Sequence, residues 1–590
     1  MDFTVTRLPV WRSRRGWLAT QAFALASPVL RSILPRPRLG GWSGRRSSPS
    51  SRGLADRLAR TATPLDPAPW QALAMQAVDT ARTGGARYAD ARLTRVLVHE
   101  MEVAGGRVAR ADERVGIGVR ALVDGYWGFS ASAIVAPDEA ARLARDAVAQ
   151  AKTNAKGPPW TVDLGESPIA RGTWATPIRI DPFAIPIEEK QDFLLYWKAR
   201  AARAGVAFPN NGADSWVQFV REERVVATSE GALFTQTVYE SGGQLICSLN
   251  GGSSALGNGG SNSPTQDVHG MTMAGAGWER FLDARILEQF ASGQIQQELR
   301  QKAAVPSRPA AIGKYTLVCD GATMAALVEE TLGVATQLDR ALGYEADARG
   351  TTVVDDPLAM VGQLAIAAPV VTLTANRSAP GELATVKWDD EGVVPEPFTL
   401  IQDGVLVDFQ TTREQAAWLA PYYHRQGRPV RSHGCAASED AHVTPIQHLP
   451  NLSLEPSASP VRLEDLIADV TTGILVEGGD VLGSDSQARS GLLIGGRMRQ
   501  IRNGQVGAAL SGGAVLFDAP SLWKHVQAVG GPSTQDVRWS SCHYFSKEDF
   551  VKVLKNQFGK GQPSQRTSHS VRAAAATLPN QPLINPSRKA

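Results

Sequence analysis

Residues 327–350, LVEETLGVATQLDRALGYEADARG, decide how this chain is interpreted. Read as a helix with 3.6 residues per turn, the stretch places Glu329, Glu330 and Val334 within about one and a half turns of each other. Glu329 and Glu330 are adjacent, so they point about 100° apart around a regular helix and do not easily share one ligand. The stretch therefore combines a carboxylate pair with an apolar position, and the rest of the sequence has to explain that pair.

Several blocks on both sides of this stretch have a recognisable order. They are ARYADARLTRV (86–96), GIGVRALVDGYWGFSAS (116–132), GKYTLVCDGATMAALVEETLGVATQLDRALGYEADARGTT (313–352), VTLTANRSAPGELATVKWDDEGVVPEPFTLIQDGVLVDFQTTREQAA (371–417), SHGCAASED (432–440), PNLSLEP (450–456) and DLIADVTTGILVEGG (465–479). Together they resemble the TldD/PmbA family, also called modulators of DNA gyrase. The similarity covers roughly residues 70–565.

The resemblance assigns roles to the helix positions. TldD members carry H-E-x-x-x-H on this helix, where two imidazoles bind Zn²⁺ and the glutamate acts as general base. Glu330 stands at the position of the base and is the candidate catalytic residue, while Glu329 and Val334 stand where the imidazoles would be. The family's third ligand is a Cys before G-K-G-Q-P. This chain keeps GKGQP at 559–563 but has Phe558 at the Cys position.

Because all three ligand positions are replaced, the resemblance implies a metallopeptidase-like protein of the zinc-poor or non-catalytic partner type, acting on small or unfolded peptides. No cofactor is expected. Without a metal-bound water to activate, Glu330 has a second interpretation, as a helix residue held by an Arg or a backbone donor. His569, in a C-terminal segment that also resembles the family, is interpreted as structural.

Two alternatives stay open. The first is an active zinc metallopeptidase with displaced ligands: Cys542 would supply a thiolate if residues 543–558 are an insertion that loops out. His433 and Cys435 belong to a local group of His and Cys side chains, which are good zinc ligands, although their spacing matches no compact zinc motif. The second alternative is an exported peptide-binding protein without catalysis.

Charge is distributed unevenly. Residues 1–60 hold twelve Arg, no Lys and two Asp, a net charge of +10, while the remainder holds 49 basic and 56 acidic residues, a net charge of −7. The acidic remainder argues against a nucleic-acid partner. The expected partners are a peptide and a second subunit, either a copy of this chain or a TldD-like paralogue that carries H-E-x-x-x-H. Because the sequence has no run of about 20 apolar residues, no membrane span is expected.

The basic N-terminus has the features of a targeting segment. SRRGWL (13–18) resembles a twin-arginine export motif, and an apolar stretch follows it at 17–30. Residues 1–66 are therefore predicted to be an export signal and a disordered linker. The protein is expected to be exported or periplasmic. The alternative is a cytoplasmic protein with an Arg- and Ser-rich extension.

The predicted fold class is α+β. Residues 67–170 are expected to form an N-terminal α/β domain, residues 171–305 a central α/β domain, and residues 306–590 a large antiparallel β-rich TldD/PmbA domain. Asp124-Gly125 and Asn503-Gly504 lie between alternating apolar residues and predict hairpin turns. The sequence contains neither a phosphate-binding P-loop nor a G-x-S-x-G elbow, which leaves nucleotide and serine-hydrolase functions without support.

Overall fold

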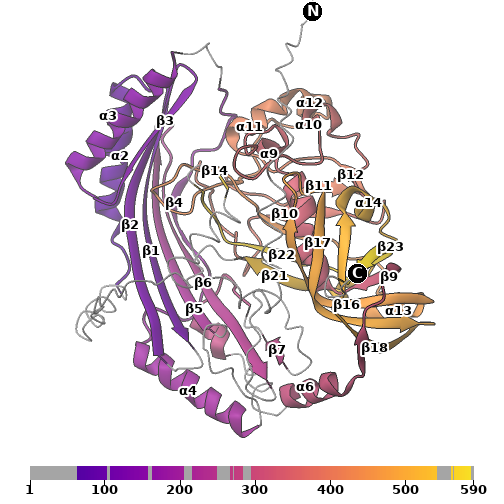
Figure 1. Ribbon diagram of the computed structural model, residues 1–590. Coiled ribbons are helices and arrows are strands. Elements are labelled where there is room, and N and C mark those ends of the chain that lie inside the picture. Colours follow the sequence, from indigo (N-terminus) through magenta and orange to yellow (C-terminus); the bar gives the residue numbers. More distant parts are fainter. Residues whose placement is uncertain are drawn as a thin grey trace, which may run out of the picture. The chain divides into compact units, whose positions relative to one another are not determined.

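The computed structural model describes most of the chain after the basic N-terminus (Figure 1). The described residues are 63–102, 107–156, 162–204, 216–248, 266–269, 272–282, 294–540, 560–561 and 564–585. The predicted export signal, Cys542, Phe558 and the expected insertion at 543–558 lie outside this part. Within it, no helix is long and apolar enough to cross a membrane.

The N-terminal half is built on one long sheet with the strand order β3-β2-β1-β5-β6-β4 and with β7 paired to β6. Asp124 and Gly125 have positive φ values, 50° and 83°, and form the predicted hairpin turn between β2 and β3. The elements are α2 (Pro67–Thr83), β1 (Tyr88–Glu102), β2 (Arg107–Val123), β3 (Tyr126–Ser132), α3 (Pro137–Asn154), β4 (Arg171–Ala175), α4 (Ile187–Arg203), β5 (Trp216–Thr228), β6 (Leu233–Ser248) and β7 (Gln266–His269).

The helices α2 and α3 pack together on one face of this sheet (Figure 1). Both begin with a proline in the first turn, where the missing N–H costs nothing. Their buried faces are largely alanine, which lets the helices lie close to the strands. Strand β1 pairs with β5 from Asp90 to Glu102. Residues 67–170 and 171–305, expected as two domains, therefore contribute strands to a single sheet.

The C-terminal half contains two larger sheets, one with the order β12-β11-β10-β15-β22-β21 and one with the order β16-β9-β23-β19-β17-β18-β8. Most pairs are antiparallel, as expected, but β15–β22, β9–β16 and β8–β18 are parallel. The strands are β8 (Ser307–Pro309), β9 (Gly313–Cys319), β10 (Leu373–Asn376), β11 (Phe398–Gln402), β12 (Val405–Leu406), β15 (Asn451–Leu454), β16 (Thr472–Ser484), β17 (Ser490–Arg502), β18 (Gln505–Ser511), β19 (Ala514–Asp518), β21 (Asp536–Ser540), β22 (His569–Ala573) and β23 (Ala576–Ile584).

The helix α7 (Gly321–Leu327) lies between these two sheets. It contacts β16 of one sheet and β21 and β22 of the other. The contact at its first residue is very close, because a Cβ on Gly321 would lie 2.5 Å from the carbonyl oxygen of Ala573. The residues that follow α7 therefore emerge at a junction of strands from both sheets.

The segment after α7 is not the single regular helix that its sequence predicts. A π-helical turn, Val328–Leu332, follows α7 and leads into the short helices α8 (Gly333–Ala335) and α9 (Leu338–Ala341). The Gly333 N–H donates to the carbonyl of Val328, five residues earlier. The hydroxyl of Thr331 in this turn accepts a hydrogen bond of 2.8 Å from the indole N–H of Trp523. Packing against Trp523 thus accompanies the wider turn.

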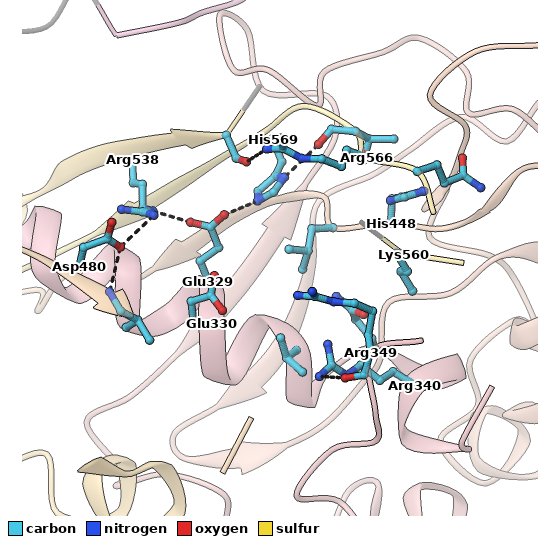
Figure 2. Close-up of a pocket in the computed structure, with 17 residues that line it drawn as sticks. Glu329, Glu330, Arg340, Arg349, His448, Asp480, Arg538, Lys560, Arg566 and His569 are labelled. Carbon is cyan, nitrogen blue, oxygen red and sulfur yellow. Dashed lines mark hydrogen bonds and ion pairs between the residues drawn. The ribbon is translucent and has the colours of Figure 1, made fainter. Parts of the chain in front are cut away.

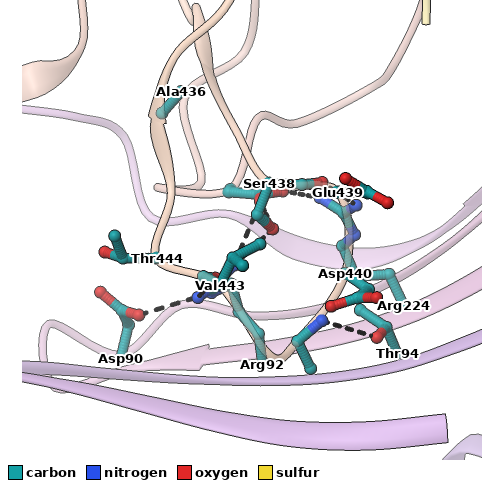
Figure 3. Close-up of polar contacts among 12 residues, drawn as sticks. Asp90, Arg92, Thr94, Arg224, Ala436, Ser438, Glu439, Asp440, Val443 and Thr444 are labelled. Carbon is teal, nitrogen blue, oxygen red and sulfur yellow. Dashed lines mark hydrogen bonds and ion pairs between the residues drawn. The ribbon is translucent and has the colours of Figure 1, made fainter. Parts of the chain in front are cut away.

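An acidic run, Asp389 to Glu391, connects the N-terminal sheet to the C-terminal half. Asp390 is 1% exposed and accepts a hydrogen bond of 2.6 Å from the Ser438 hydroxyl. It also forms ion pairs with Arg92, at 3.4 Å, and with Arg224, both from the N-terminal sheet. The loop that carries Ser438 continues across the same strands (Figure 3). This buried network holds the two halves together.

Candidate functional site

The π-helical turn brings Glu329 and Val334 to one cavity. In a regular helix, two positions five residues apart are about 140° apart around the axis. The extra residue in the π-helical turn reduces this angle, and such turns are frequent at functional sites. Glu329, Glu330 and Val334 all line a cavity of about 170 Å³ (Figure 2). The other lining residues are Gln337, Arg340, Arg349, His448, Leu449, Asp480, Val481, Arg538, Ser540, Lys560, Gln565, Arg566, Thr567 and His569.

Glu329 is buried, and each of its two carboxylate oxygens contacts a nitrogen of another side chain. Its Oε2 lies 2.5 Å from Nε of Arg538, and its Oε1 lies 3.0 Å from Nε2 of His569. Arg538 also pairs with Asp480 at 3.0 Å. Burial by itself raises the pKa of Glu329, but Arg538 and the His569 hydrogen bond outweigh it and hold this pKa at about 2. Glu329 is therefore an ionised carboxylate with both oxygens engaged.

His569 is the first residue of β22, the strand that pairs with β21, and its ring makes two contacts. Its Nδ1 lies 3.3 Å from the backbone carbonyl of Thr567, while its Nε2 faces Glu329. Both ring nitrogens thus lie within hydrogen-bonding distance of an oxygen atom. His569 was expected to be structural, and the structure makes it part of the cavity wall.

Glu330 has a different environment from its neighbour. It is half-buried, and the described part of the chain offers its carboxyl no hydrogen bond or ion pair, so the expected Arg or backbone donor is not found there. Burial and the charge of Glu329 raise the pKa of Glu330 to about 7, against the opposing effects of Arg538 and Arg349. Two adjacent carboxylates cannot both ionise cheaply, and the one without partners takes the proton.

The opposite wall of the cavity is cationic. Lys560, from the surviving GKGQP segment, pairs with Asp339 at 2.9 Å. Arg340 donates to the backbone carbonyls of Thr351 at 2.9 Å and of Arg349 at 2.7 Å. The Arg349 side chain extends into the cavity on the side that faces Glu330 (Figure 2). Burial and the neighbouring Arg566 lower the pKa of Arg349, although Glu330 and Glu345 oppose this.

Two parts of the chain match models of one family. Residues 89–151 match PmbA/TldA metallopeptidase domain 1, and residues 312–567 match the PmbA/TldA metallopeptidase C-terminal domain. This chain belongs to the TldD/PmbA family. This chain is 22% identical over 394 residues to a metalloprotease of Methanocaldococcus jannaschii. The alignment covers 66% of this chain and 78% of that protein.

Solved structures share the fold of this TldD/PmbA protein. TldE from Thermococcus kodakarensis superposes with a TM-score of 0.57 at 15% identity, covering 86% of this chain and 98% of that one. A candidate modulator of a DNA gyrase from Thermotoga maritima superposes with a TM-score of 0.58 at 13% identity, covering 87% and 100%. At these identities, the likeness establishes the α+β fold.

The cavity residues of this TldD/PmbA protein do not fit a zinc ion. A catalytic zinc site needs three protein donors with free lone pairs. Both oxygens of Glu329 are engaged, one by Arg538 and one by His569, and the Val334 side chain has no donor atom. Phe558, at the third position, lies outside the described residues. Across the described ranges, no three His, Cys, Asp or Glu side chains are grouped closely enough to share a metal.

The weaker metal candidates are not brought together either. His433 Nε2 lies 3.0 Å from Asp408, and its ring stacks on Phe398 with 3.9 Å between ring centroids. Cys435 is fully buried, and burial raises the pKa of its thiol to about 12. A thiol with such a pKa is a poor metal ligand at neutral pH. Cys542 lies outside the described residues.

The sequence did not identify Arg538, Arg349 or His569 as site residues. Arg538 and His569 contact Glu329 across 209 and 240 residues of chain, a separation that no local spacing can indicate. Arg349 could have been found from the sequence, because it lies within residues 313–352, a block that resembles the family. Lys560 likewise lies within the surviving GKGQP segment.

Proposed function

We propose that this protein is a zinc-poor or non-catalytic member of the TldD/PmbA family, which binds small or unfolded peptides. The observation that carries the proposal is the engagement of Glu329 by Arg538 and His569, which leaves the first ligand position occupied by a closed ion pair. Val334 supplies no second donor. A zinc ion at this place would lie against Arg538, and like charges at such a distance repel strongly.

The test is the zinc content of the purified full chain, measured by mass spectrometry of the metal after dialysis against a weak chelator. We expect well below one zinc per chain, because isolated carboxylates bind zinc weakly. The alternative, an active enzyme with displaced ligands, is favoured by the likeness to a metalloprotease. One tightly bound zinc per chain, lost on Glu330→Ala or Cys542→Ser, would establish that alternative and contradict the proposal.

We also propose that the protein works as a dimer, either with itself or with a TldD-like paralogue that carries H-E-x-x-x-H. The likeness to TldE supports this. Light scattering on the chain alone and on its mixture with such a paralogue distinguishes the two assemblies. Peptidase activity in the mixture that neither chain shows alone would favour the heterodimer. Monomers in both samples would argue against either assembly.

For location, we propose export by the twin-arginine route, supported by SRRGWL at 13–18 and the apolar stretch that follows. Cell fractionation with the Arg14→Lys, Arg15→Lys double variant tests it. Export of the parent and retention of the variant are expected. Retention of both would support the cytoplasmic alternative.

A further inference from the structure

The charges that line the cavity are not balanced. Five Lys and Arg side chains line it, Arg340, Arg349, Arg538, Lys560 and Arg566, against three carboxylates, Glu329, Glu330 and Asp480. Two of these carboxylates, Glu329 and Asp480, pair with the same cation, Arg538. The third, Glu330, has no ion pair in the described part. Lys560 is matched by Asp339, which does not line the cavity. Arg340 and Arg349 are the lining cations left without an ion pair in the described part.

Arg340 and Arg349 account for the excess. In the described ranges neither guanidinium has a carboxylate partner, and Arg340 bonds only to the backbone carbonyls of Thr351 and Arg349. Burial, together with Arg349, lowers the pKa of Arg340 to about 10. Arg340 is buried and Arg349 is half-buried. Glu330 and Glu345 favour the charged form of both side chains, but in the described part neither carboxylate is in ion-pair contact with them. Because an arginine side chain stays charged in proteins, such a pair is costly unless an anion joins it.

The backbone holds the two arginines in place. The Arg349 N–H and the Gly350 N–H both donate to the Glu345 carbonyl, at 2.7 and 2.8 Å. Gly350 has φ +86°, and a Cβ there would lie 1.8 Å from the carbonyl oxygen of Ser486, so only glycine fits. Arg340 in turn donates to the Arg349 carbonyl. The loop is thus fixed, and it presents a preformed pair of guanidinium groups.

The rest of the cavity wall contains apolar side chains and one side-chain amide. Val334, Leu449 and Val481 line the cavity, which can therefore accept an aliphatic side chain. Gln337 is 4% exposed, and among the described residues its side-chain oxygen has no hydrogen-bond donor. A buried acceptor without a partner is destabilising, and a ligand N–H is the group that it lacks. Carboxylate, aliphatic side chain and N–H occur together at the C-terminal residue of a peptide.

We propose that this cavity binds the C-terminal carboxylate of a peptide, with Arg340 and Arg349 as its ligands. A guanidinium presents parallel N–H groups that match the two oxygens of a carboxylate. The inference rests on the proposed peptide-binding function and names the part of the peptide that is recognised.

The experiment measures binding of the full chain by calorimetry to four probes. They are acetyl-Ala-Ala-Leu with a free carboxylate, the same peptide as its C-terminal amide, the amide of acetyl-Ala-Asp-Leu, and inorganic phosphate. The free acid is expected to bind at least about tenfold more tightly than either amide, because charge-assisted hydrogen bonds to arginine are lost in the amides. Phosphate at millimolar concentration is not expected to displace the free acid.

Variants locate the site. Arg349→Gln is expected to weaken binding of the free acid about tenfold to a hundredfold and to weaken binding of the amide much less, because the amide forms no charge-assisted hydrogen bond. Arg349→Lys keeps the charge without the planar guanidinium, so its affinity for the free acid should lie between those of the parent and Arg349→Gln. Arg462→Gln is the matched control, because Arg462 is exposed and pairs with Asp465 far from the cavity lining. It should bind every probe as the parent does.

The outcomes separate the inference from the function beneath it. Equal binding of acid and amide would overturn carboxylate recognition and leave peptide binding intact. No binding of any peptide would contradict the proposed function itself. Tighter binding of the Asp-containing amide, or displacement by phosphate, would show a general anion site and overturn the inference. If Arg349→Gln fails to fold, the parent's preference between acid and amide still decides.

Discussion

The acidic run at Asp389 to Glu391 and the cavity around Glu329 use the same residue types to opposite effect. In the acidic run, Asp390 is fully buried and contacts Arg92, Arg224 and the Ser438 hydroxyl. In the cavity, Glu329 is satisfied, but Glu330 and Arg349 face open space without partners in the described part. Paired buried charges fix a structure, whereas unpaired charges beside a cavity remain available to a ligand.

The largest expected effect is at the closed network. Asp390→Ala would leave Arg92 and Arg224 buried without this carboxylate, and we expect the free energy of unfolding to fall by about 3–5 kcal/mol. Urea unfolding monitored by tryptophan fluorescence measures the change. Asp465→Ala is the matched control, because its exposed carboxylate pairs with Arg462 and caps a short surface helix, so its loss should cost only about 1 kcal/mol. Equal stability of the two variants would show that the network is not structural.

Glu329→Ala should lower the free energy of unfolding by less, because Arg538 would still form its ion pair with Asp480. We expect a loss of about 2–3 kcal/mol at neutral pH. Because the pKa of Glu329 is held at about 2, below its unfolded value of 4.5, its stabilisation is complete above pH 4.5 and is lost as pH falls towards 2. Unfolding of parent and variant at pH 7 and pH 3 measures this. A difference that grows at pH 3 would contradict it, and exposed Glu464→Ala serves as the control.

Glu330→Gln should stabilise the protein, in contrast to the change at its neighbour. The pKa of Glu330 is about 7 in the folded chain and 4.5 in the unfolded one, so its ionisation costs stability as pH rises from 4.5 to 7. The charged groups nearest to it are Glu329, Arg538, Arg349 and Asp480. We expect a gain of about 1–2 kcal/mol at pH 8 and none at pH 4. A loss of stability at pH 8 would mean that Glu330 is ionised and paired.

The smallest expected effect concerns catalysis. The triple variant Glu329→His, Val334→His, Phe558→Cys restores the family's ligand pattern, and the π-helical turn directs the first two positions into one cavity. We expect more zinc than in the parent but little peptide cleavage, since no partners orient the new imidazoles. A buried imidazole at position 334 costs about 1–3 kcal/mol. The single variant Glu329→His is the control. Zinc content equal to that of the parent in a folded triple variant would show that the helix is misaligned with the family.

Local sequence predicted local structure well. Asp124-Gly125 and Asn503-Gly504 form the expected hairpin turns, because their positive φ values suit those residues. The family blocks predicted the α+β fold. Within residues 327–350, Glu329, Glu330 and Val334 line the cavity, and their role stays a prediction. The prediction of a regular helix there was wrong. The segment contains a π-helical turn in which Thr331 accepts a hydrogen bond from Trp523, and no rule of residue spacing indicates such a long-range contact.

The sequence by itself determined the family and the fold class, because both depend on residue identities in local patterns. It also placed Glu329 and Val334 on the segment that the family resemblance marks as the site. The tertiary structure alone decided what surrounds them. Arg538 and His569 reach Glu329 only because β21 and β22 lie beside α7, and Arg349 faces the same cavity only because its loop folds back. Charges hundreds of residues apart meet through strand pairing and packing, and the spacing of residues along the chain carries no record of those contacts.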